Sequence, residues 1–96
     1  MNFGVALTEM VDIGWTAQAF EAGTTTPKAA LRDGITVLIA RIAKVPSTLR
    51  LTYLLGGGED QAGAVARLRV AEDAIRRAWR GIGTYDLQIE KSVKQE

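Results

Sequence analysis

Residues 49–60 read LRLTYLLGGGED, and this stretch decides the fold. Leucines and a tyrosine alternate with Arg50 and Thr52, which is the period of a strand with one buried face. Three glycines then provide a flexible turn. Glu59 and Asp60 follow, and acidic residues suit the positive amino end of a helix. The stretch therefore predicts a strand, a turn and the start of a helix.

Two amphipathic helices are predicted around this strand. The first spans about Pro27–Lys44, because Thr26 can cap it, Pro27 suits its first turn and Pro46 ends it. The second spans about Asp60–Gly81 and ends among glycines. The residues on the two apolar stripes are Leu31, Ile35, Leu38, Ile39 and Ile42 in the first helix, and Leu68, Ala71, Ile75, Ala78, Trp79 and Ile82 in the second.

Strands are also predicted before the first helix and after the second. Apolar residues occupy most odd positions from Phe3 to Ala19, which predicts two collinear strands or one strand bent at Gly14 or near Glu9. Residues 1–10 form an N-terminal extension or an extra strand in this interpretation. A last strand over residues 85–90 is expected to fray into a polar tail, residues 91–96.

The order of these elements predicts the fold class. Residues 1–96 are expected to form a single α+β domain, a two-layer sandwich of β-α-β-α-β order with two amphipathic helices on one face of a mixed sheet. The first two strands should be parallel, because a helix connects them. Trp15, Phe20, Tyr53 and Trp79 are expected to be core residues or edge anchors.

Composition excludes several classes of function. The chain has no cysteine and no histidine, so the usual thiol nucleophiles, zinc sites and proton shuttles near neutral pH are missing. We therefore expect no enzyme activity, no metal and no cofactor. The net charge of +1 gives no electrostatic case for nucleic acid, and no apolar run is long enough to insert into a membrane. The first residues lack the pattern of a signal peptide.

Residues 20–27 read FEAGTTTP and are followed by Leu31 and Leu38. This stretch and the order of elements after it resemble the C-terminal domain of the outer-membrane protein A (OmpA) family, over about residues 11–93. The resemblance implies a domain of the bacterial periplasm or cell envelope that binds the diaminopimelate of peptidoglycan without catalysis. In that family, the ligand is held by an Asp in the turn after the second strand and by an Arg early in the next helix.

Two registers carry these family positions onto this chain. Without gaps, the Asp position falls on Gly56 and the Arg position on Ala71, so the binding motif is degenerate. With a gap, Asp60 supplies the anion and either Arg67 or Arg69 supplies the cation. We favour the gapless register, because it also aligns the end of the second helix.

Three functions remain open at this point. The first is a degenerate OmpA-like module that serves interaction or structure within a larger envelope protein. The second is a working peptidoglycan-binding domain that uses Asp60 with Arg67 or Arg69. The third is a small cytosolic α/β domain that self-associates through its edge strands, because the β-prone N-terminal segment presents unpaired backbone groups. Possible partners are therefore peptidoglycan, another protein or a second copy.

Overall fold

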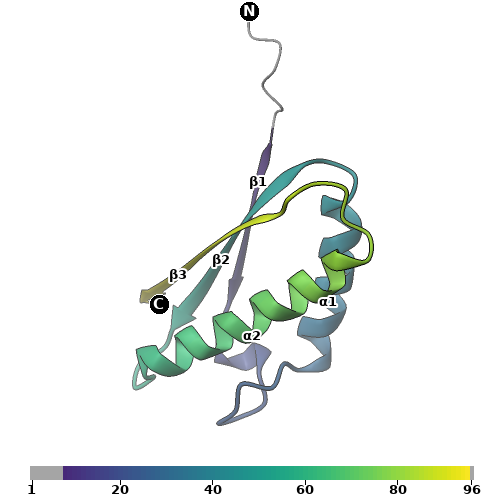
Figure 1. The fold of residues 1–96 in the computed structure, drawn as a ribbon. Helices are drawn as coiled ribbons and strands as arrows, with labels where there is room; N and C mark the ends of the chain where they lie inside the picture. Colours follow the sequence, from purple (N-terminus) through teal and green to yellow (C-terminus); the bar gives the residue numbers. More distant parts are fainter. Residues whose placement is uncertain (1–7, 96) are drawn as a thin grey trace, which may run out of the picture.

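The computed structural model describes residues 8–95, which form two helices, a short 3-10 turn and one three-stranded sheet (Figure 1). The elements in chain order are β1 (Glu9–Trp15), the 3-10 turn η1 (Ala17–Ala19), α1 (Ala29–Ile42), β2 (Ser47–Leu55), α2 (Gln61–Arg80) and β3 (Gln88–Gln95). The predicted α+β class and element order are confirmed. No helix within these residues is long and apolar enough to cross a bilayer.

The sheet is parallel throughout, so the expectation of a mixed sheet was wrong. Strand β2 lies in the centre, with β1 and β3 on its two sides. Each connection between neighbouring strands contains a full helix, which returns the chain to the end of the sheet where it began. The register places Val11 beside Leu49, and Leu49 beside Ile89. Odd-numbered side chains of all three strands therefore share one face.

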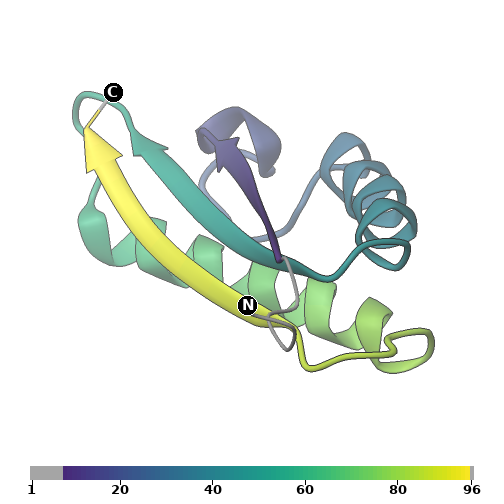
Figure 2. The ribbon, with the colours of Figure 1, turned by 90° about the horizontal axis from the view of Figure 1, so that it is seen from above.

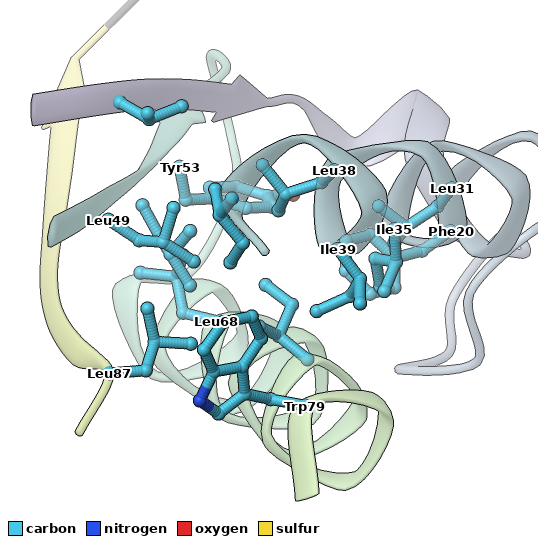
Figure 3. Packing of buried hydrophobic residues seen from close by; sticks show 14 of the residues in the cluster. Phe20, Leu31, Ile35, Leu38, Ile39, Leu49, Tyr53, Leu68, Trp79 and Leu87 are labelled. Atoms are coloured by element: carbon cyan, nitrogen blue, oxygen red, sulfur yellow. The ribbon is translucent and has the colours of Figure 1, made fainter. Parts of the chain in front are cut away.

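Both helices cover this odd-numbered face (Figure 2). Leu49, Leu51 and Tyr53 of β2 are 0% exposed, and Figure 3 shows Leu49 and Tyr53 among the side chains of the helices. The other buried apolar residues are Val11, Phe20, Leu31, Ile35, Leu38, Ile39, Ile42, Leu55, Ala64, Leu68, Ala71, Ile75, Trp79 and Leu87. The predicted stripes are thus largely confirmed, except that Ala78 and Ile82 are exposed.

The opposite face of the sheet carries polar side chains over its middle. Arg50 of β2 lies between two carboxylates, 3.5 Å from Asp12 of β1 and 3.7 Å from Glu90 of β3. The hydroxyl oxygens of Thr52 and Ser92 lie 3.2 Å apart in the next row. Alternation along the strands thus separates an apolar face from a charge-paired polar face.

The start of α1 differs from the prediction. Lys28 is the N-cap residue and its side chain makes no capping hydrogen bond, so Thr26 does not cap the helix. Pro27 pairs instead with Phe20 in an isolated antiparallel bridge, and the Lys28 N–H donates to the Ala19 carbonyl at 2.9 Å. This pairing keeps residues 26–28 extended and delays the helix to Ala29.

The outer strands also differ from their predicted limits. Strand β1 ends at Trp15, because Thr16 caps η1 and its hydroxyl accepts from the Gln18 N–H at 3.3 Å. The part of the expected first strand before Thr8 lies outside the described residues. The polar tail assigned to residues 91–96 was wrong up to Gln95, because β3 continues that far in register with β2. Its polar residues are tolerated because β3 is an edge strand.

Trp79 and Tyr85 anchor the connection from α2 to β3. The Trp79 indole N–H donates to the Tyr85 carbonyl at 3.1 Å, and the two rings pack with centroids 4.7 Å apart. The Tyr85 hydroxyl donates to the Ile42 carbonyl at 2.7 Å and accepts from the Ser47 N–H at 3.1 Å. Trp79 is 7% exposed, which confirms it as a core residue. These contacts join the end of α1, the start of β2 and the entry to β3.

We predict that Gly83→Ala destabilises the domain. A Cβ at Gly83 would lie 2.2 Å from the Trp79 ring, so the buried indole would have to move. Overpacking of this kind costs about 1–3 kcal/mol. Gly81→Ala is the matched control, because a Cβ there meets nothing within 4 Å and the φ of −88° suits alanine. Urea unfolding should show a lower free energy of unfolding for Gly83→Ala and no change for Gly81→Ala. Equal stability of the two variants would contradict this packing.

Candidate functional site

A hollow lies where β2 ends and α2 begins, at the carboxyl end of β2. The hollow has a volume of about 330 Å³. Its walls come from the loop between η1 and α1, the β2–α2 turn and the first turns of α2, through Gly23, Thr24, Thr25, Glu59, Asp60, Gly63 and Arg67.

The β2–α2 turn holds Glu59 in place. The Gly56 N–H donates to Oε1 of Glu59 at 2.8 Å, while the Glu59 N–H donates to the Gly56 carbonyl at 3.1 Å. Gly58 has a φ of 82°, a conformation that glycine adopts without steric cost. The glycine-rich stretch therefore forms a closed turn that directs the Glu59 carboxylate back toward β2.

Tyr53, Glu59 and Arg67 form a hydrogen-bonded cluster beneath the hollow. The Tyr53 hydroxyl donates to Oε2 of Glu59 at 2.5 Å and accepts from Nη1 of Arg67 at 2.7 Å. The same Nη1 lies 3.5 Å from Oε2 of Glu59. The side chains of Arg67 and Glu59 are only 13% and 24% exposed. This partial burial makes their pairing stronger than that of an ion pair in full solvent.

Two further contacts hold Arg67 against the loop before α1. Its Nε donates to the Thr24 carbonyl at 2.9 Å, and its guanidinium lies 5.3 Å from the centre of the Phe20 ring. A cation at this distance from an aromatic face is attracted to it. Arg67 is therefore fixed by residues from three separate parts of the chain, and its orientation toward the hollow is well defined.

The cluster perturbs the ionisation of two of its members. The hydrogen bond from Tyr53, followed by the one from the Gly56 N–H, lowers the pKa of Glu59. Burial, followed by the hydrogen bond to Glu59, raises the pKa of Tyr53. Near neutral pH, Tyr53 is thus a neutral hydroxyl and Glu59 is an anion paired with Arg67.

Asp60 lies on the rim of the hollow and has a structural role of its own. It is the N-cap residue of α2, and its Oδ1 accepts from the Ala62 N–H at 3.1 Å. This confirms the interpretation of Asp60 as an acid that stabilises the helix start. Asp60 is also exposed, so its carboxylate remains accessible from the hollow.

The gapped register proposed Asp60 with either Arg67 or Arg69, and the structure places these two arginines in different hollows. Asp60 and Arg67 line the same hollow, whereas Arg69 lines a different one of about 270 Å³ between α2 and β3, together with Lys91. Arg67 is therefore the cation that the fold brings near Asp60. In the gapless register, Ala71 is 0% exposed in the core and cannot contact a ligand.

Glu59 and Tyr53 are the members of this cluster that were not predicted as site residues. Glu59 was interpreted as a helix-start acid beside Asp60, and Tyr53 as a core aromatic. One signal was available in the sequence: Tyr53 is the one aromatic residue in the segment 47–55, and its hydroxyl needs a partner when the ring is buried. Among the described residues, no group of three or more Asp or Glu side chains is placed to hold a metal ion.

Comparisons with family models, curated proteins and solved structures found no match to this chain. The resemblance of residues 11–93 to the OmpA family therefore stays a prediction.

We predict that Glu59→Gln reduces the loss of stability on acidification. Because the pKa of Glu59 is lowered in the folded chain, its ionised form stabilises the fold above the ordinary value of 4.5. That contribution disappears as the pH falls through the folded-state pKa. Glutamine cannot be protonated in this range, and its single carbonyl oxygen can accept from either Tyr53 or Gly56 but not from both, so the variant is also less stable than the wild type near neutral pH.

Urea unfolding at about pH 7 and about pH 3 measures this difference. The difference should be smaller in Glu59→Gln than in the wild type. Glu21→Gln, which alters an exposed carboxylate, controls for the change in net charge. Equal pH dependence of Glu59→Gln and the wild type would contradict a paired Glu59.

Proposed function

We propose that this chain is a non-catalytic binding module whose ligand occupies the hollow between Asp60 and Arg67. The ligand class is a small zwitterionic amino-acid group, and diaminopimelate within peptidoglycan is the member that the OmpA-like pattern implies. The observation that carries the proposal is the position of one exposed carboxylate and one fixed guanidinium on the same 330 Å³ hollow. A zwitterion needs such a pair of opposite charges on rigid backbone.

The charges that remain available favour this ligand class. Both oxygens of Glu59 already accept hydrogen bonds from within the chain, so Glu59 is a supporting residue. Asp60 uses Oδ1 for capping, and its other oxygen can accept from an ammonium group. Arg67 uses Nε and Nη1 internally, whereas its Nη2 has no hydrogen-bond partner among residues 8–95 and can donate to a carboxylate.

The rigidity of the site also supports binding. Arg67 is held by Tyr53, Thr24 and Phe20, so a ligand does not have to immobilise a long side chain. Pre-positioned groups lose less conformational entropy on binding, which improves affinity. Asp60 is fixed in the same way by its bond to the start of α2.

The cellular location follows from the same proposal. Peptidoglycan lies in the cell envelope, so a domain of this function works in the periplasm as part of an envelope protein. The competing interpretation is that the hollow is a remnant of such a site and that the domain serves interaction or structure only. Ligand titration separates the two.

We predict that Asp60→Asn weakens binding of a soluble diaminopimelate-containing muropeptide about 10-fold to 100-fold while the fold remains intact. Asparagine caps helices as well as aspartate does, so the change removes the charge and keeps the cap. The loss of one charge-assisted hydrogen bond, about 1.5–3 kcal/mol, sets this range. Calorimetric titration measures the affinity, and circular dichroism checks the fold.

Two controls make the titration specific. Arg69→Met changes a cation of the neighbouring hollow and should leave the affinity unchanged. A muropeptide with lysine in place of diaminopimelate keeps the ammonium group but lacks the carboxylate for Arg67, so it should bind more weakly to the wild type. No measurable binding of the diaminopimelate ligand by the wild type would favour the degenerate module.

A further inference from the structure

Strand β3 forms one edge of the sheet, and β1, where the described chain enters, forms the opposite edge. Within residues 8–95, no strand pairs with the outer side of β3. The N–H and C=O groups on such an edge are a template for a further strand. The outer side of β3 is therefore a candidate surface for binding an extended chain.

The register shows which backbone groups of β3 point outward. The Glu9 N–H donates to the Pro46 carbonyl at 3.0 Å, so the even-numbered residues of β2 direct their backbone groups toward β1. The odd-numbered residues of β2 then face β3. In parallel pairing, Leu49 bonds to the two neighbours of its register partner, Ile89. The even-numbered residues of β3 therefore bond to β2, and the odd-numbered ones direct their backbone groups outward.

The second hollow, of about 270 Å³, adjoins this edge, and we call it the β3 hollow. Its walls come from α2 and β3 and not from β2, so it lies toward the outer side of β3. Val65 of α2 is 43% exposed and Val93 of β3 is half-buried, so a strand added to β3 would cover apolar surface. The residues that line the β3 hollow are Gln61, Val65, Leu68, Arg69, Lys91, Ser92 and Val93.

Positive charge predominates around the β3 hollow. Glu72 of α2 accepts from Lys91 at 2.6 Å and from Arg76 at 3.2 Å, so one carboxylate pairs with two cations. Arg69, on the wall of the hollow, forms no ion pair within residues 8–95. Three cations and one anion therefore lie along this side of α2 and β3, and Arg69 is the cation available to an acidic group.

We propose that β3 and the β3 hollow bind an extended acidic peptide of a partner protein. The peptide adds a fourth strand to the sheet, and one of its Glu or Asp side chains lies in the hollow against Arg69. Strand addition combines main-chain hydrogen bonds, which give affinity, with a pocket for a side chain, which gives specificity. The site is separate from the hollow at Asp60 and Arg67, so this proposal does not depend on the proposed function.

A second copy of this chain fits the edge less well than an acidic peptide does. The side chains of odd-numbered residues lie on the helix-covered face of the sheet, so a second β3 would present Ile89, Lys91, Val93 and Gln95 to the hollow. This set contains a cation and no acid. Lys91 of one copy would then approach Arg69 and Lys91 of the other, and like charges that face each other across strands are destabilising.

Titration with a synthetic peptide tests the charge pairing. The probe has the eight-residue length of β3, and its threonines alternate with valines, of which a central one is replaced by glutamate. Exchanging that glutamate for glutamine should weaken binding to the wild type about 5-fold to 10-fold, because the hollow shields the ion pair from solvent more than an open surface does. The two peptides should bind Arg69→Met equally.

Arg77→Met is the matched control, because it removes an exposed cation of α2 that does not line the hollow. This variant should still prefer the glutamate peptide. Equal binding of the two peptides by the wild type would overturn the pairing with Arg69, as would a preference that persists in Arg69→Met. Circular dichroism should show the same fold for the wild type and both variants.

Backbone methylation of the peptide tests the strand addition. In an added strand, alternate N–H groups point toward β3 and the others point away. N-methylation of one set, either the threonines or the residues between them, should therefore abolish binding, whereas methylation of the other set should preserve it. The same result for both sets would overturn strand addition. Failure of the unmodified peptide to bind would overturn the whole proposal, and a dimer in light scattering would then assign the edge to a second copy.

Discussion

The fully buried ring of Tyr53 places a hydroxyl at the end of the core, where it must find hydrogen-bond partners. The fold meets this requirement with Glu59, whose carboxylate accepts a hydrogen bond from the hydroxyl, and with Arg67, whose guanidinium donates a hydrogen bond to it. Because these two residues belong to the turn after β2 and to α2, the hydroxyl fixes how the chain leaves the sheet. Arg67 then extends the same network to the loop before α1 through Thr24. The candidate binding hollow is thus the outer surface of a network that the core itself requires.

The fold could be predicted from the sequence where the signals are local. The alternation along β2 and the stripes on both helices arise within one element, and their burial agrees with the prediction. Two of the features that were predicted wrongly depend on contacts between residues far apart in the sequence. The start of α1 was misplaced, because the Phe20–Pro27 bridge outweighs the capping signal at Thr26. The polar residues 91–95 looked like a tail, because their partners on β2 lie some forty positions earlier, as for Thr52 and Ser92. The parallel direction of β3 was predictable, because the rule that a connecting helix makes two strands parallel applies to α2 as it does to α1.

The candidate site was predictable in part for a similar reason. Asp60 and Arg67 could be proposed from a motif, because both lie close together in sequence on one helix start. The choice between Arg67 and Arg69 could not be made, since it depends on which side of α2 faces the loop at Thr24. The role of Glu59 as a partner of Tyr53 could not be predicted. In the sequence, an acid that stabilises a helix start cannot be distinguished from one whose carboxylate turns back toward the preceding strand. The turn geometry around the glycines, not the residue type, gives Glu59 its role.

The row of charges across the open face of the sheet has a consequence for strand alignment. Arg50 contacts Asp12 on one side and Glu90 on the other, but all three side chains are well exposed, so the row adds little to stability. The row does distinguish strand registers that differ by two residues. A slip of β1 by two residues would preserve the buried face yet bring Met10 or Gly14 opposite Arg50, and a similar slip of β3 would bring Gln88 or Ser92 there. Hydrophobic burial alone cannot tell these alignments apart, whereas three facing charges can, so the row selects one pairing of the strands among several that the core would accept.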